Sequence, residues 1–150
     1  MKTDSFQRSE ESAYGLALAG SAPAYNEAAF TYFLEIERRR SERSNRPFLL
    51  MLADLAPQPG SDARMDRAVA STVLSSLGRC LRDTDFVGWY LDQQVAGAVL
   101  TEHPAIHYEQ AVTSLCQRVT RTLSRRLPKT VAGRLQLRVY HEIPQRGRTS

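Results

Sequence analysis

Arginine supplies most of the charged chemistry of this 150-residue chain, since 18 of its 20 basic residues are Arg and the formal net charge is +4. The cations gather in two segments, residues 38–46 and residues 118–138, and the second contains no acidic residue. A guanidinium group binds phosphate or carboxylate through paired hydrogen bonds. A phosphate-rich ligand, an acidic protein or nucleic acid would therefore fit, and a purely solvated surface is the alternative. No aromatic residue interleaves with the second segment, which argues against sequence-specific nucleic-acid binding.

Cysteine and histidine offer little further chemistry. Cys80 and Cys116 lie in helical patterns without C-x-x-C spacing, as expected for buried, reduced thiols. His103 and His107 are separated by Pro104 and give no zinc signature. No apolar run approaches the length of a membrane span, and the polar start of the chain is unlike a secretory signal. We therefore expect a cytoplasmic protein without metal or cofactor.

The composition, with 42% hydrophobic and 24% charged residues, is that of one packed globular domain. The helices and strands of this domain must position the arginines. Apolar residues at helical spacing predict helices over residues 26–44, 63–82 and 105–126. Asn45 is the expected stop of the first helix. Residues 1–24 are interpreted as a leader that is flexible or a short helix.

Four strands are predicted between and after these helices. The continuous apolar run at residues 48–53 is typical of a buried central strand. Residues 86–90 and 95–100 form a hairpin around a four-residue turn that lacks the usual glycine. Residues 135–143 alternate between apolar and polar, and residues 145–150 are expected to be a flexible tail. The order α-β-α-β-β-α-β predicts an α/β fold of the α+β type, with helices flanking a central, mostly antiparallel sheet.

The predicted hairpin carries the most specific pattern in the chain. Residues 81–90 read L-R-D-T-D-F-V-G-W-Y, and the turn Leu91-Asp92-Gln93-Gln94-Val95 begins five residues after Asp85. This segment resembles GGDEF diguanylate cyclase domains, which read L-R-x-x-D-x-v-a-R-Y before the turn G-G-[DE]-E-F. Y-N-E-A-A-F at residues 25–30 is similar to the family's Y-N-R-R-x-F, and C-Q-R-V-T at residues 116–120 to its A-E-R-I-R. The resemblance covers about residues 25–144 and implies the nucleotide-cyclase-like sheet of that family.

The signature turn departs from the family where catalysis requires specific residues. Active members hold metal ions and promote attack with carboxylates, but Gln93 and Gln94 are neutral amides and poor ligands for hard cations. Leu91 and Asp92 replace both glycines, so side chains would crowd the phosphates, and Asp92 would also repel them.

The predicted metal site is incomplete as well. Asp54 matches the family's first metal-binding Asp, but Ala56 stands at the position of the second. The guanine-reading N-D-x-x-G-H segment and the final helix have no counterpart in the sequence. We therefore expect a degenerate domain with no catalytic residue and no metal.

One family element is retained, the R-x-x-D formed by Arg82 and Asp85. In the family's cyclases that show product inhibition, this element binds cyclic di-GMP, and Arg118 matches the arginine of A-E-R-I-R. A guanidinium can bind a phosphate or the Hoogsteen edge of guanine, and a carboxylate can accept from guanine N1 and N2. The alternative is that Arg82 and Asp85 only form a salt bridge in a turn.

Three functions follow from these observations. The leading hypothesis is a non-catalytic signalling or scaffold domain that binds a protein partner or a second copy of itself, with cyclic di-GMP as a regulator. The second is a cyclic di-GMP receptor acting through Arg82 and Asp85. The third is a residual cyclase using Asp54.

Overall fold

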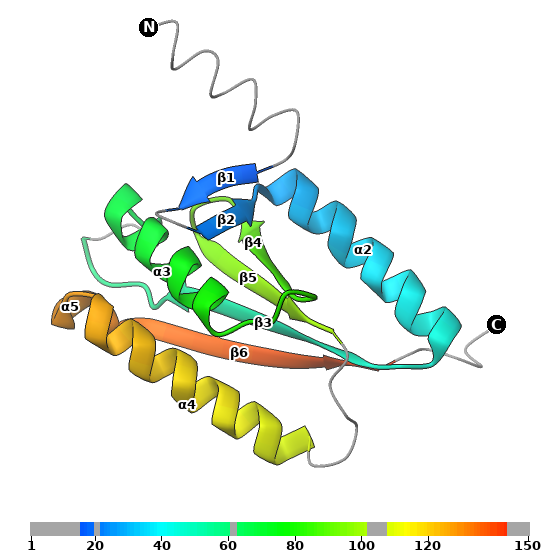
Figure 1. Ribbon diagram of the computed structural model, residues 1–150. Coiled ribbons are helices and arrows are strands. Elements are labelled where there is room, and N and C mark those ends of the chain that lie inside the picture. Colours follow the sequence, from blue (N-terminus) through cyan, green and yellow to red (C-terminus); the bar gives the residue numbers. More distant parts are fainter. Residues whose placement is uncertain (1–15, 20–21, 61–62, 102–107, 144–150) are drawn as a thin grey trace, which may run out of the picture.

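The described strands form one six-stranded sheet in the order β1-β2-β4-β5-β3-β6 (Figure 1). The computed structural model describes residues 16–19, 22–60, 63–101 and 108–143. Its elements are β1 (Leu16–Ala19), β2 (Ala22–Tyr25), α2 (Glu27–Ser44), β3 (Phe48–Leu55), α3 (Arg67–Arg79), β4 (Phe86–Leu91), β5 (Val95–Leu100), α4 (Tyr108–Arg126), α5 (Lys129–Ala132) and β6 (Leu135–Glu142). All pairings are antiparallel except that of β2 with β4, so the mostly antiparallel sheet predicted from the sequence is confirmed.

Helices cover both faces of the sheet, and the central strand β3 contributes to both cores. Phe48, Leu50 and Leu52 pack with residues of α2 on one face, whereas Met51 and Ala53 pack with residues of α3 and α4 on the other. Successive side chains of a strand point to opposite faces, so a strand buried on both sides reads as an unbroken apolar run. This explains why the central strand could be predicted.

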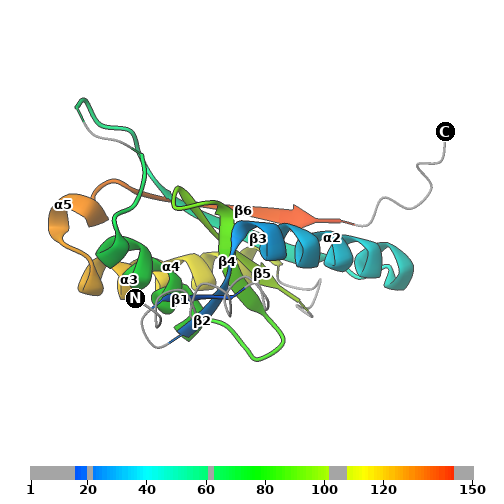
Figure 2. The same ribbon diagram turned by 90° about the horizontal axis from the view of Figure 1, so that it is seen from above.

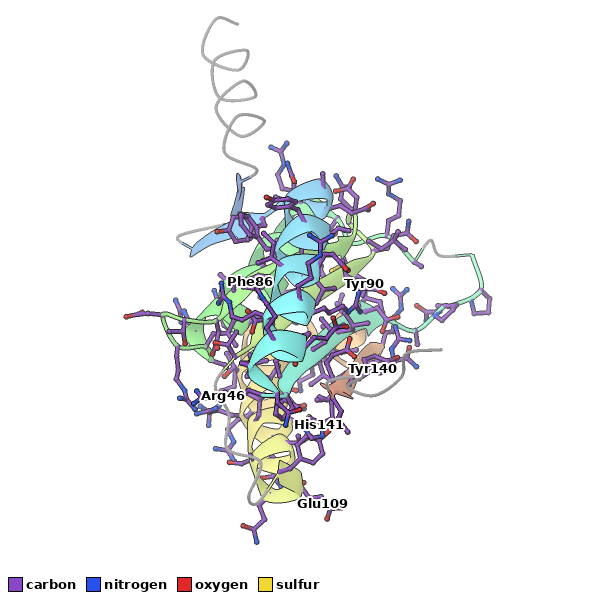
Figure 3. The ribbon with its side chains drawn as sticks, turned by 90° about the vertical axis from the view of Figure 1, so that its right-hand side faces the viewer. Arg46, Phe86, Tyr90, Glu109, Tyr140 and His141 are labelled. Atoms are coloured by element: carbon purple, nitrogen blue, oxygen red, sulfur yellow. The ribbon has the colours of Figure 1, made fainter. Side chains whose placement is uncertain are left out.

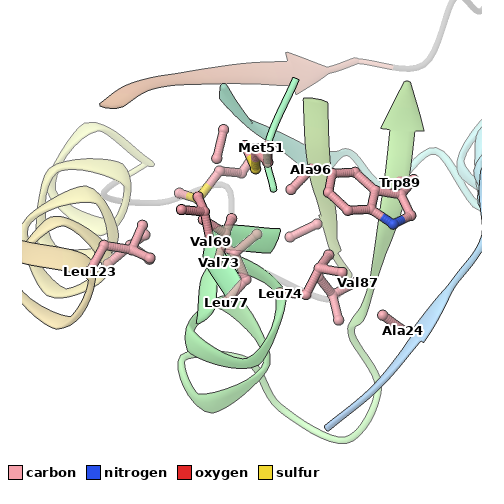
Figure 4. Close-up of a cluster of buried hydrophobic side chains, with 14 of the residues drawn as sticks. Ala24, Met51, Val69, Val73, Leu74, Leu77, Val87, Trp89, Ala96 and Leu123 are labelled. Atoms are coloured by element: carbon pink, nitrogen blue, oxygen red, sulfur yellow. The ribbon is translucent and has the colours of Figure 1, made fainter. Parts of the chain in front are cut away.

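The core beneath α3 includes the tryptophan of the hairpin (Figure 4). Trp89 is buried on β4, together with Val87 and with Val73 and Leu77 of α3. Trp89 is therefore a core residue and does not offer a contact surface beside the signature turn.

Capping residues set the ends of the first two helices. Asn26 accepts a hydrogen bond from the Ala29 amide at the start of α2, and Asn45 ends it in the left-handed conformation, which confirms the predicted stop. α3 begins at residue 67 and not at residue 63, because Asp66 caps it through the Val69 amide.

The structure differs from the sequence expectation at residues 16–19 and 22–25, which form two antiparallel strands and not a flexible or helical leader. β2 joins the sheet beside β4, where Tyr25 lies opposite Gly88. The strands are short, rich in Ala and interrupted by Pro23, so local propensity is low and tertiary contacts decide their structure. The expected tail, the first 15 residues and His103 and His107 lie outside the described residues.

Candidate functional site

The signature turn closes without glycine because Gln93 adopts the conformation that glycine usually supplies. The Gln94 amide donates to the Leu91 carbonyl over 3.0 Å, and Gln93 has a φ of 58°. A positive φ at the third residue of a tight turn normally requires Gly or Asn. For Gln it costs about 1–2 kcal/mol, which the rest of the fold must offset.

Side chains and backbone from distant segments occupy the polar groups of this turn. The Asp92 amide donates to Oε1 of Glu27, at the start of α2, over 2.6 Å. The Gln93 carbonyl accepts from the Met65 amide over 2.7 Å, and the Gln93 side chain accepts from Arg64 over 3.3 Å. An N–H that could bind an anionic ligand at the turn is thus bonded to a carboxylate of the chain itself.

Asp54, the counterpart of a metal-binding residue, pairs with an arginine. It lies opposite Val95, the last residue of the signature turn, so β3 brings it to the expected place. Its Oδ2 is 3.4 Å from Nη2 of Arg138 on β6, and its buried Oδ1 has no hydrogen-bond partner among the described residues. The backbone of Ala56 bonds with Arg134, whose Nε donates to the Ala56 carbonyl over 3.1 Å. Within the described ranges, no cluster of three or more His, Cys, Asp or Glu residues could hold a metal ion.

A separate pocket of about 440 Å³ brings together the three ligand-binding residues predicted from the sequence. Arg82, Asp85 and Arg118 all line it, and Arg79 at the end of α3 adds a third guanidinium. The four charged residues come from three places in the fold: the end of α3, the turn that leads into β4, and α4. The apolar part of the lining consists of Leu49, Leu81, Leu100, Ala111 and Leu115. The pocket therefore combines an apolar lining with three positive charges and one negative charge.

Asp85 holds this pocket together through the backbone. Its Oδ2 accepts from the Arg82 amide over 3.0 Å, and its Oδ1 accepts from the amide of Thr101, just after β5, over 2.9 Å. The Arg82 guanidinium, in contrast, is exposed and makes no hydrogen bond or ion pair with any described residue. The alternative of a turn salt bridge between Arg82 and Asp85 is therefore wrong, and the Arg82 side chain is available to a ligand.

Several arginines of the first segment, near the end of α2, are paired with glutamates of α2 or β6. Arg38 lies 2.9 Å from Glu142 of β6, and Arg40 lies 3.4 Å from Glu37. Arg40 and Arg46 line a second pocket, of about 520 Å³, which shares Thr101 with the pocket of Arg82. The positive charge at this end of the sheet is thus less available than the sequence alone suggests.

Sequence reasoning missed several residues of both sites. Arg79 lies three residues before Arg82, a spacing that could have indicated a shared surface. Glu27 and Arg138 gave no such signal, because Glu27 is 65 residues away from its partner Asp92 in the sequence and Arg138 is 84 residues away from its partner Asp54.

Comparisons with known proteins agree on the fold. No protein-family model and no curated protein matches the sequence. Solved GGDEF-domain structures match with TM-scores of 0.54 to 0.61. The chain is 19% identical to the diguanylate cyclase SiaD of Pseudomonas aeruginosa, solved in complex with its activator SiaC, with a TM-score of 0.61 over 84% of this chain and 49% of that one.

Two further structures are similar over most of their length. The GGDEF domain of FimX from Pseudomonas aeruginosa is 13% identical, with a TM-score of 0.58, over 83% of this chain and 79% of that one. The GGDEF domain of DgcB from Caulobacter crescentus, solved in complex with c-di-GMP, is 17% identical, with a TM-score of 0.57, over 81% and 74%. The chain therefore has the fold of a GGDEF domain, as the motif resemblance implied. None of the helices in the described ranges combines the length and hydrophobicity of a transmembrane segment.

Proposed function

We propose that this chain is a non-catalytic signalling domain with the GGDEF fold, which binds a protein partner and is regulated by cyclic di-GMP in the arginine pocket. The observation that carries the proposal is the contrast between its two candidate sites. The signature turn is occupied by side chains of the chain itself, whereas the exposed Arg82 guanidinium lines a pocket with two further arginines.

The loss of catalysis is supported by the partners of Asp54 and of the turn. Metal-assisted attack needs carboxylates that are free to hold divalent cations. Arg138 already supplies a positive charge to Asp54, and Gln93 and Gln94 offer only neutral amides. The Glu27 carboxylate accepts from the Asp92 amide. Its negative charge repels a triphosphate from the signature turn.

Cyclic di-GMP suits the arginine pocket chemically. It carries two phosphates and two guanines, and guanidinium groups bind either through paired hydrogen bonds. Each oxygen of the Asp85 carboxylate accepts one short bond from a backbone amide, which leaves lone pairs for guanine N1 and N2. The similar DgcB domain was solved with c-di-GMP, and the similar SiaD with an activator protein. Both kinds of ligand are therefore reasonable to test on this chain.

A calorimetric titration with cyclic di-GMP tests the ligand. We expect binding by the native chain and a weakening of about 10- to 100-fold for Arg82→Ala, because one charged hydrogen-bonding group contributes roughly 1.5–3 kcal/mol. Arg125→Ala is the matched control, since Arg125 is equally exposed on α4 but does not line the pocket. No heat from the native chain, or equal weakening by both variants, would contradict the proposed site.

Incubation with GTP and magnesium tests the absence of catalysis. We expect no cyclic di-GMP product, since Asp54 is paired with Arg138 and the turn carries no acid at the metal-binding positions. Turnover that is abolished by Asp54→Asn would show that the residual-cyclase hypothesis is correct.

A further inference from the structure

The strand β6 leaves one long edge of the sheet unpaired. Among the described strands it bonds only to β3, over eight residues, and no labelled helix or strand lies outside it in Figure 2. A strand of this length presents a row of free N–H and C=O groups that can pair with another strand. Such edges in monomeric proteins are usually short, covered, charged or interrupted by Pro. β6 spans eight residues and contains no Pro, and its charged residues Arg138 and Glu142 are each paired within the chain.

One face of β6 is also uncovered. Gln136, Arg138 and Tyr140 alternate with half-buried residues, and all three are exposed, Tyr140 by 44%. Tyr140 lies opposite Leu50 of β3, on the face that packs with α2 further along the sheet. Figure 3 labels Tyr140 and the next residue of β6, His141. The edge and the exposed face together form a continuous surface, here called the β6 edge.

The charges on the β6 edge are arranged about Tyr140. Arg138 and Glu142 are two residues before and two after it, so all three side chains point to the same face. Arg138 pairs with Asp54 of its own chain, and Glu142 pairs with Arg38. The surface thus carries a cation on one side of the tyrosine and an anion on the other.

We propose that two copies of this chain pair antiparallel through β6, about a two-fold axis at Tyr140. This register places Arg138 of each copy opposite Glu142 of the other, and the two Tyr140 side chains opposite one another at about 4.5–5.5 Å between Cβ atoms. Arg38 and Glu142 of one copy then lie beside Arg138 and Asp54 of the other, so positive and negative charges alternate across the boundary between the copies. The same patch serves both copies, as a closed two-fold dimer requires.

Neighbouring registers are less favourable. An axis at Arg138 places two arginines opposite one another, and an axis at Val139 places Arg138 opposite Tyr140 and leaves the charges unmatched across the boundary. Like charges directly opposite in a sheet are destabilising. The charges therefore select the register, while the backbone hydrogen bonds supply the pairing.

This inference rests on the proposed function only in naming the protein partner as a second copy. The dimer is measured without cyclic di-GMP and without GTP, so its failure would leave the proposals for the arginine pocket and for catalysis untouched.

Opposite charges at the axis position test the register without disturbing either ion pair. Tyr140→Lys places two lysines opposite one another in the dimer, and Tyr140→Glu places two glutamates there. Each variant should weaken self-association at least about tenfold, whereas an equimolar mixture should restore dimers through a Lys–Glu pair. Gln136→Lys is the matched control, because Gln136 is equally exposed on the same face but lies four residues from the axis.

Light scattering coupled to gel filtration over a concentration series gives the readout, with circular dichroism to confirm that each variant is folded. A concentration-dependent dimer for the native chain, its loss in each single variant and its return in the mixture would support the proposal. A native chain that stays monomeric up to roughly millimolar concentration would overturn it. So would variants that dimerise as the native chain does, or a mixture that stays monomeric.

Discussion

Replacing Asp85 should destabilise the fold, whereas replacing Arg82 in the same R-x-x-D motif should not. Asp85 links two segments that are distant in sequence, since it accepts from the amide of Arg82 before β4 and from the amide of Thr101 after β5. The Arg82 side chain is exposed and has no described partner. One motif therefore contains a structural residue, Asp85, and an exposed side chain, that of Arg82, which is the proposed ligand-binding group.

The size of the effect follows from the bonds that Asp85→Ala removes. Hydrogen bonds to a charged group contribute about 1.5–3 kcal/mol each, and partial exposure of Asp85 favours the lower end of that range. Thr101 is buried, so its amide would keep an unsatisfied donor. We expect a loss of about 2–4 kcal/mol, which lowers Tm by about 5–15 °C in a chain of this size.

Urea and thermal unfolding of Asp85→Ala, Arg82→Ala and Asp83→Ala measure the difference. Asp83 is the matched control, an exposed aspartate in the same turn whose side chain makes no hydrogen bond or ion pair with a described residue. Arg82→Ala and Asp83→Ala should both stay within about 0.5 kcal/mol of the native chain. An Asp85→Ala variant of native stability would refute the reasoning, because the two amide bonds would then contribute nothing.

Three further predictions follow from the same structure. In urea unfolding, Gln93→Gly should stabilise the fold by about 1 kcal/mol, because glycine tolerates the positive φ at this position. Gln94→Gly should instead destabilise the fold by about 0.5–1 kcal/mol. Equal effects of the two variants would contradict the turn geometry. Gly97→Ala should cost about 1–3 kcal/mol, since its Cβ would lie 2.7 Å from Cζ of Phe30, and a neutral result would show that the ring can move. Burial raises the pKa of the Cys116 thiol, so its alkylation, followed by peptide mass spectrometry, should need a higher pH than that of a cysteine in a short peptide.

The elements that the sequence predicted well are those with local signals. The ends of α2 follow from Asn26 and Asn45, whose caps involve neighbouring residues. The strands β1 and β2 could not be predicted in this way, because they pair with each other and, through β2, with β4, and they lack a period-two pattern. The start of α3 was predicted too early, because the apolar periodicity gave no weight to the Asp66 cap.

The same distinction holds for the two candidate sites. Arg82, Asp85 and Arg118 meet in one pocket, as the family resemblance implied. The bonds of Glu27 to the turn and of Arg138 to Asp54 join residues far apart in the chain, and each uses a residue type that is common on surfaces. No local pattern marks such a pair, although both pairs bear directly on the proposed loss of catalysis.

Backbone amide chemical shifts during a cyclic di-GMP titration test the central claim most directly, because they separate the two sites in one experiment. The account predicts that the amides of Arg82 and Thr101, which bond to Asp85, shift on binding, while those of Asp92 and Gln94 in the signature turn do not. Shifts confined to the turn, or no shifts at all, would contradict it.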